Sequence, residues 1–214
     1  MTALFLQLRK RVAPFSATLA PGASAGVADI VPERHPRDAA LFGIATDGLP
    51  LYLHLGDPRP GPILIAGNPT PLLRCIARTT TQAGAITQVI TIFPELWADL
   101  RGQAVVVETD DRYLGGIARE MMSRPTPYPR WLVVIDRYKV RDVEALAQIC
   151  RWGPPRGVWP IVAADHPAEV PDVIRPFFRT LVAAQGNGYQ LRKPKKPTLF
   201  SPGSWQIQHT FFTP

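Results

Sequence analysis

The sequence has no long hydrophobic run and only two cysteines. No apolar stretch in its 214 residues approaches the roughly 20 residues that a transmembrane helix needs. In the opening segment MTALFLQLRKRVAPF the charges follow a short apolar patch, which is the wrong order for a secretory signal. Cys75 and Cys150 show no CxxC or Cys/His spacing. These absences predict a cytoplasmic protein with no membrane partner and no metal site, whose two thiols are buried and reduced.

Acidic residues are absent from the end of the chain. Residues 185–214 contain no Asp or Glu, while the whole chain carries a net charge of +7. Four cations gather there in the proline-flanked run RKPKKP, namely Arg192, Lys193, Lys195 and Lys196. An extended cationic segment of this kind suits contacts with phosphate groups, so we expect these side chains to bind nucleic acid, DNA in particular. The alternative is a solvated loop at the edge of the fold.

Apolar runs of strand length are present in the middle of the chain. They predict strands at 62–66, 87–93, 104–108, 131–136, 158–164 and 180–185. The segments between them predict helices over 71–83, 110–123 and 140–151. Continuous apolar strands separated by helices are typical of a mostly parallel sheet with helices on both faces. The sequence therefore predicts an α/β fold.

The two ends differ from this pattern. Residues 1–40 form an irregular N-terminal segment, and LFGIATDGLPLYLHL then predicts a short hairpin around Asp47 and Gly48. After residue 186 a weak alternation predicts short edge strands and loops. We predict three parts: an irregular segment at 1–40, an α/β core at 41–185, and a basic C-terminal extension at 186–214 that packs on the core.

The stretch PILIAGNPTPLLRCIARTTT, residues 62–81, has the outline of a phosphate-binding loop without its chemistry. A Walker A loop, GxxxxGK[ST], binds phosphate and Mg²⁺ through backbone N–H groups, a lysine and a hydroxyl. If Gly67 is its first glycine, the last three positions hold Leu72, Leu73 and Arg74. Pro69 and Pro71 moreover have no N–H to donate. The residues that would hold a phosphate are therefore missing.

Two interpretations of this junction stay open. Thr70 is a suitable N-cap and Pro71 fits the first helical position, which predicts a plain capped helix. The other interpretation keeps an anion site made of helix-terminal amides and Arg74. A vestigial nucleotide site would comprise Gly67, Asn68, Thr70, Arg74 and Asp136.

The stretch WLVVIDRY places Asp136 at the carboxyl end of an apolar strand, where ligands bind in open α/β sheets. P-loop ATPases use such an Asp for Mg²⁺, and often a following Glu to activate water. Arg137 stands in the place of that Glu and cannot accept a proton. The alternative for Asp136 is a structural role, bound to loop amides or paired with Arg137.

Other polar residues have ordinary expectations. Asp110 and Asp111 are expected to serve as N-cap and first-turn acid of the next helix. His166 stands apart from other histidines in the sequence, so no metal spacing arises.

Taken in order, these pieces resemble the FtsK/SpoIIIE branch of the FtsK–HerA P-loop DNA-pumping ATPases. GIATDGLPLYLHLGDPRPGPILIAGNPTPLLR is similar to the hairpin, strand and Walker A loop of that family. VVVETDDRYLGGIAREMMSR resembles the helix that follows, and PRWLVVID with GVWPIVAADHP resembles Walker B and the next strand. The match covers roughly residues 41–185. The resemblance implies a P-loop NTPase fold with a RecA/FtsK-like core.

The departures from the family concern its phosphate-contacting elements. Leu73 stands at the lysine position and Arg137 at the Glu position, and Asp165 and His166 replace the family's Gln and Arg. Their joint loss predicts a pseudo-ATPase that acts without a cofactor in protein or nucleic-acid binding and assembly. Expected partners are an intact FtsK/HerA-type ATPase, a second copy of the chain, or DNA.

Two other functions stay open. The chain is alternatively an active ATP-dependent DNA translocase, in which unusual or partner-supplied residues bind the phosphates of ATP and Mg²⁺. The third interpretation is a small α/β enzyme unrelated to ATP, although the sequence supplies no nucleophile or base for it.

Overall fold

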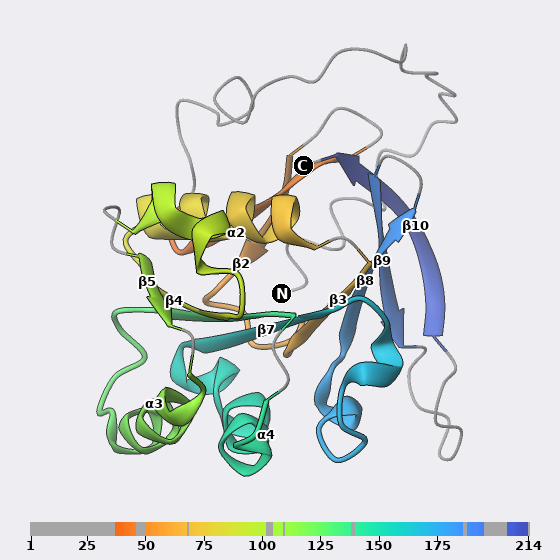
Figure 1. The fold of residues 1–214 in the computed structure, drawn as a ribbon. Helices are drawn as coiled ribbons and strands as arrows, with labels where there is room; N and C mark the ends of the chain where they lie inside the picture. Colours follow the sequence, from red (N-terminus) through yellow and green to blue (C-terminus); the bar gives the residue numbers. More distant parts are fainter. Residues whose placement is uncertain are drawn as a thin grey trace.

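The computed structural model describes residues 37–45, 50–67, 69–101, 105–108, 110–137, 140–185, 188–194 and 205–213. The strands among them form one ten-stranded sheet in the order β2-β1-β10-β9-β8-β3-β7-β6-β4-β5. Helices cover both of its faces (Figure 1). Within these residues, no helix has both the length and the apolar character that crossing a bilayer requires.

Half of the sheet is parallel. Five parallel ladders join six strands, which are β3 (Ile63–Ala66), β4 (Ile86–Thr91), β5 (Val105–Glu108), β6 (Trp131–Asp136), β7 (Val158–Ala164) and β8 (Thr180–Gln185). All residues of β3 and β7 are buried, as expected for strands covered on both faces. The predicted α/β class is confirmed, and the bounds predicted for β6, β7 and β8 agree with the structure.

The helices form two layers. On one face of the sheet lie α2 (Thr70–Gln82) and the 3₁₀-helix η2 (Pro94–Leu100), and α3 (Arg112–Ser123) and α4 (Val143–Trp152) lie on the other (Figure 1). Each layer has its own hydrophobic cluster. The first includes Leu73, Ile76 and Trp97, and the second includes Leu114 and Leu146. Shorter 3₁₀ turns are η3 (Pro154–Arg156), η4 (Pro167–Glu169) and η5 (Arg175–Phe177).

The other half of the sheet is antiparallel. The hairpin of β1 (Ala39–Ala45) and β2 (Pro50–His54) confirms the predicted pairing, although the turn at Asp47 and Gly48 lies outside the described residues. The positions of β9 (Gly188–Pro194) and β10 (Trp205–Thr213) differ from the prediction of edge strands. They lie inside the sheet because β10 pairs with β9 on one side and with β1 on the other, so that β2 becomes the edge.

In this arrangement the β1–β2 hairpin packs against α2. The backbone N–H of Leu41 in β1 donates to Thr79 Oγ1 at 3.0 Å, and Cys75 Sγ donates to the Leu41 carbonyl at 3.7 Å. The helix is therefore held between the parallel sheet and the hairpin. Arg192 and Lys193 of the predicted basic surface belong to β9, whereas Lys195 and Lys196 lie outside the described residues. The predicted division into three parts stays a prediction.

Candidate functional site

The junction between β3 and α2 is closed by contacts within the protein. Gly67 has a φ of 101°, which favours glycine, and its N–H points to the end of β7. It donates to the carbonyls of Ala164 at 3.1 Å and Asp165 at 3.2 Å. Pro69 offers no N–H, and Asn68 lies outside the described residues. The Gly67 amide, which would contact a phosphate in a Walker A loop, is thus already engaged.

The prediction that Thr70 caps α2 is wrong. The helix starts one residue earlier than predicted, with Pro69 in the N-cap position and no side-chain capping bond. The carbonyl of Pro69 accepts the first helical hydrogen bond, from Leu73 N–H at 2.9 Å. The Thr70 hydroxyl instead accepts a hydrogen bond from Arg137 Nη2 at 2.9 Å. Thr70 therefore links the start of α2 to the end of β6.

Leucine occupies the lysine position of the loop for a packing reason. Leu72 and Leu73 are both fully buried in the hydrophobic cluster beneath α2. The Leu73 side chain therefore packs in the core and, unlike the Walker A lysine, places no positive charge at the junction. The positive charge there comes from Arg137 instead.

Asp136 is buried beneath the side chains of Trp97 and Arg137. Its side chain is fully buried at the end of β6. Asp136 Oδ2 accepts a hydrogen bond from the indole Nε1 of Trp97 in η2 at 3.0 Å, and Oδ1 lies 3.6 Å from Arg137 Nε. Burial raises the pKa of Asp136 above its ordinary value, although the Trp97 hydrogen bond and the Arg137 charge oppose this shift. The pairing with Arg137 follows one of the two roles anticipated from the sequence.

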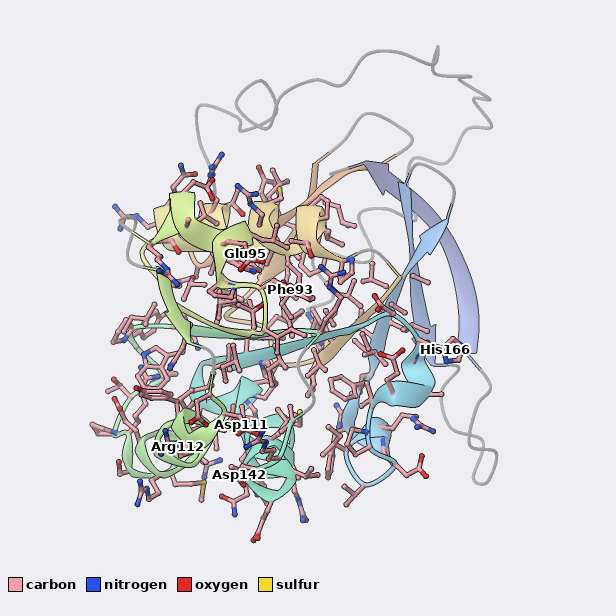
Figure 2. The ribbon with its side chains drawn as sticks, viewed as in Figure 1. Phe93, Glu95, Asp111, Arg112, Asp142 and His166 are labelled. Carbon is pink, nitrogen blue, oxygen red and sulfur yellow. The ribbon has the colours of Figure 1, made fainter. Side chains whose placement is uncertain are left out.

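Arg137 adopts an unusual backbone conformation to make these contacts. Its φ is 49°, in the left-handed region, and its N–H donates to the Ala163 carbonyl at 3.0 Å. The guanidinium carbon lies 5.0 Å from the centroid of the Phe93 ring, a cation–π distance. Figure 2 shows Phe93 between η2 and the sheet, on the same side as α2. One arginine therefore joins β6, α2 and the segment before η2.

A pocket of about 490 Å³ opens beside these residues, and we name it the α2–η2 pocket. Its lining combines three arginines with a hydroxyl and apolar groups: Thr70, Pro71, Arg74, Cys75, Arg78, Leu96 and Arg137. None of the described residues that line it carries a carboxylate. One carboxylate stands nearby, since Asp99 Oδ2 lies 2.5 Å from Arg74 Nη2 and 3.2 Å from Arg78 Nη2. Burial raises the pKa of the Cys75 thiol to about 11, so this thiol is not a nucleophile near neutral pH.

The acids on the opposite face have structural contacts. Asp111 was expected to act at the start of α3, but its side chain makes no capping bond there. Asp111 Oδ2 accepts hydrogen bonds from the N–H groups of Arg141 and, at 2.9 Å, Asp142, just before α4. Asp142 in turn caps α4 through Ala145 N–H at 3.0 Å. Figure 2 shows Asp111, Arg112 and Asp142 together on the α3–α4 side of the sheet.

His166 and Asp110 also have local partners. His166 Nδ1 accepts from Ala168 N–H at 3.1 Å and so caps η4. Asp110 contacts the side chain and the backbone N–H of Arg112. Over the described ranges, no group of three or more His, Cys, Asp or Glu residues could hold a metal ion.

The structure brings together three of the predicted vestigial site residues. Thr70 and Arg74 line the α2–η2 pocket, and Asp136 lies directly behind Arg137. Gly67 belongs to the same junction, but its N–H faces β7. Sequence reasoning missed Arg78, Trp97 and Asp99. Only Arg78 left a signal, because residues four apart, such as Arg74 and Arg78, share one face of a helix.

Comparisons with known proteins identify the fold. No protein-family profile and no curated protein matches this sequence. Solved structures do match. The conjugation coupling protein TcpA of pCW3, solved with ATPγS, superposes with a TM-score of 0.61 at 12% identity, over 77% of this chain and 64% of that one. The fold is therefore shared, while the identity is too low to transfer more than the fold.

Two further solved structures match similarly. The cytoplasmic domain of the secretion ATPase EccC of Thermomonospora curvata gives a TM-score of 0.60 at 14% identity, over 89% of this chain and 30% of that one. EssC (ATPases 2 and 3) of Geobacillus thermodenitrificans gives 0.55 at 16% identity, over 80% and 40%. This chain thus spans less than two thirds of each of these three structures. The predicted likeness to FtsK/SpoIIIE-type ATPase domains holds at the level of the fold.

Proposed function

We propose that this chain is a non-catalytic module with a P-loop ATPase fold, which acts by binding and assembly and does not turn over ATP. The observation that carries the proposal is the sealing of Asp136. Mg²⁺ needs near-octahedral oxygen ligands at about 2.0–2.1 Å and keeps several waters. Asp136 is instead fully buried and faces the Trp97 indole and the Arg137 guanidinium, an environment that argues against such an ion.

Three further features support the same conclusion. The Gly67 N–H is engaged with β7, and the lysine position is occupied by the buried Leu73. Arg137 holds the position of the water-activating Glu, where it supplies a cation and no base. The steps that P-loop hydrolysis requires, namely phosphate cradling, metal binding and water activation, each lack a residue.

The proposed partners are an intact ATPase of the same fold, a second copy of this chain, or DNA. The matched TcpA, EccC and EssC structures support the first choice only through the fold that they share with this chain. For DNA, the proposal places the attraction on the run that begins at Arg192. Binding measured at several salt concentrations, with Arg192, Lys193, Lys195 and Lys196 changed to Ala, tests that part, because lost phosphate contacts flatten the salt dependence.

Calorimetry and an ATPase assay with Mg-ATP test the central proposal. We expect no saturable heat at sub-millimolar Mg-ATP and no phosphate release above that of buffer. Asp136→Asn is the matched variant, since it keeps the shape of the side chain while removing its charge. Micromolar Mg-ATP affinity, or turnover, that Asp136→Asn abolishes would show an active site and favour the translocase alternative.

A further inference from the structure

The α2–η2 pocket carries an excess of positive charge. Arg74 and Arg78 lie on one face of α2, and Arg137 reaches the pocket from the end of β6. Their side chains are partly exposed, at 37%, 37% and 25% respectively. Three guanidinium groups therefore share one opening, and the described residues that line it include no carboxylate.

Within the described residues, the ion pairs of Arg74 and Arg78 both go to a single oxygen of Asp99. Both arginines reach Asp99 Oδ2, at 2.5 Å and 3.2 Å, and the Asp99 side chain is 45% exposed. Exposed ion pairs of this kind contribute little to stability, so a stronger anion can displace the carboxylate. The third cation, Arg137, pairs with the buried Asp136, whose Oδ1 lies 3.6 Å from Arg137 Nε.

The chemistry of the lining selects the ligand. Guanidinium groups bind phosphate oxygens in bidentate fashion, and an arginine pair with a third cation suits an anion with several phosphate groups. The volume of about 490 Å³ lies within the roughly 300–1,000 Å³ typical of small-molecule sites. Because Asp136 is sealed, the cations that would neutralise such an anion are arginines and not a metal ion.

We propose that the α2–η2 pocket binds a small polyphosphate anion without a metal ion, and that Asp99 occupies its arginines until this anion displaces it. The anion could be inorganic or the phosphate tail of a nucleotide, and these two sources share the recognising chemistry. The proposal goes beyond the function proposed above, because it does not depend on which macromolecule the module binds or on the basic run at Arg192.

Calorimetric titration of the full chain with sodium tripolyphosphate in EDTA at low salt tests this site. We expect saturable binding by the wild type, and binding about tenfold to hundredfold weaker for Arg78→Ala, since a charge-assisted contact is lost. Asp99→Asn should bind more tightly, by about threefold to tenfold, because the competing carboxylate is neutralised. Arg119→Ala is the matched control, an exposed arginine on α3 across the sheet.

The opposite signs of the two pocket variants make the test specific. Equal weakening by Arg78→Ala and Arg119→Ala would reveal non-specific attraction to a basic protein and overturn the proposal. So would binding that requires Mg²⁺, no binding at millimolar tripolyphosphate, or unchanged affinity for Asp99→Asn. If Arg78→Ala does not fold, Arg78→Gln and Asp99→Asn carry the test.

A comparison arm with ATP in EDTA separates the two sources of the anion. Equal affinities for ATP and tripolyphosphate would support recognition of the phosphates alone. Binding of ATP without binding of tripolyphosphate would place recognition on the base and sugar, and would overturn the proposal. Because all arms are free of metal, a negative result leaves the Mg-ATP test of the non-catalytic function unaffected.

Discussion

Two buried aspartates on opposite faces of the sheet are held in different ways. Asp111, between β5 and α3, is 2% exposed and accepts hydrogen bonds from two backbone N–H groups just before α4. Asp136, at the end of β6, is 0% exposed and faces side chains, among them the Trp97 indole and the Arg137 guanidinium. The Asp111 carboxylate thus joins the start of α3 to the backbone before α4, whereas the Asp136 carboxylate is surrounded by side chains.

The difference shows how one residue type serves two purposes in one fold. Backbone N–H groups are present at nearly every position, so the contacts of Asp111 depend on the path of the chain and little on its composition. The contacts of Asp136 depend on Trp97 and Arg137 being those residues. A few side-chain substitutions can therefore change the chemistry around Asp136 at the carboxyl end of β6.

The largest effect is expected for Asp111→Ala. This change leaves two N–H groups near α4 without their acceptor, which should lower the free energy of unfolding by about 2–4 kcal/mol. Asp111→Asn retains an amide oxygen and should lose about 1 kcal/mol. Urea unfolding at pH 7 measures both variants. Equal losses would mean that the charge of Asp111, and not its position as an acceptor, holds α3 to α4.

A smaller effect of opposite sign is expected for Asp136→Asn. Burial raises the pKa of Asp136 in the folded state above its ordinary value of 3.8. The stabilisation by the protonated form is thus complete below pH 3.8 and is lost as the pH rises through the folded pKa. The variant does not titrate, so its stability relative to wild type should increase over that rise.

Unfolding measured from pH 4 to pH 8 checks this expectation, with Asp111→Asn as a companion that lacks the Trp97 and Arg137 contacts. At neutral pH Asp136→Asn should be at least as stable as the wild type. A large loss of stability at pH 7 would show that ionised Asp136 is net stabilising, and would remove the contrast between the two aspartates.

The smallest effect concerns the backbone of Arg137. Both Arg137→Ala and Arg137→Gly remove the contacts with Thr70 and Phe93, but only glycine adopts a φ of 49° without a steric cost. We expect the glycine variant to be more stable than the alanine variant by about 0.5–1 kcal/mol. Thermal unfolding of the pair is the measurement. An alanine variant of equal stability would mean that the chain relaxes once the guanidinium contacts are gone.

The parallel half of the fold could be predicted because its signal is local. Residues 131–136, 158–164 and 180–185 are apolar runs bounded by polar or glycine-containing segments, and each forms a strand with the predicted bounds. The sequence pattern also anticipated helices on both faces. The place of β10 was not predictable, since nothing near it in the sequence identifies β1 as its partner.

The candidate site was predictable only in part, for the same reason. Thr70, Arg74 and Asp136 could be placed near one another from the strand and helix order. Trp97 meets Asp136 because β4 pairs with β6 and brings η2 above the end of β6, a contact that no local pattern encodes. The Thr70 cap failed because Pro69 starts the helix first.

The pairing of β1 with β10 has a consequence for folding during synthesis. The ladder joins Ile44 to Thr213 and Ala45 to Phe212, so the first and last described strands are neighbours in the sheet. On the ribosome, the hairpin is synthesised before β10, so the edge of β1 that pairs with β10 stays open until β10 has been made. An uncovered strand edge invites pairing with other chains. A nascent chain of this protein therefore depends on β10, or on a chaperone, to protect the open edge of β1.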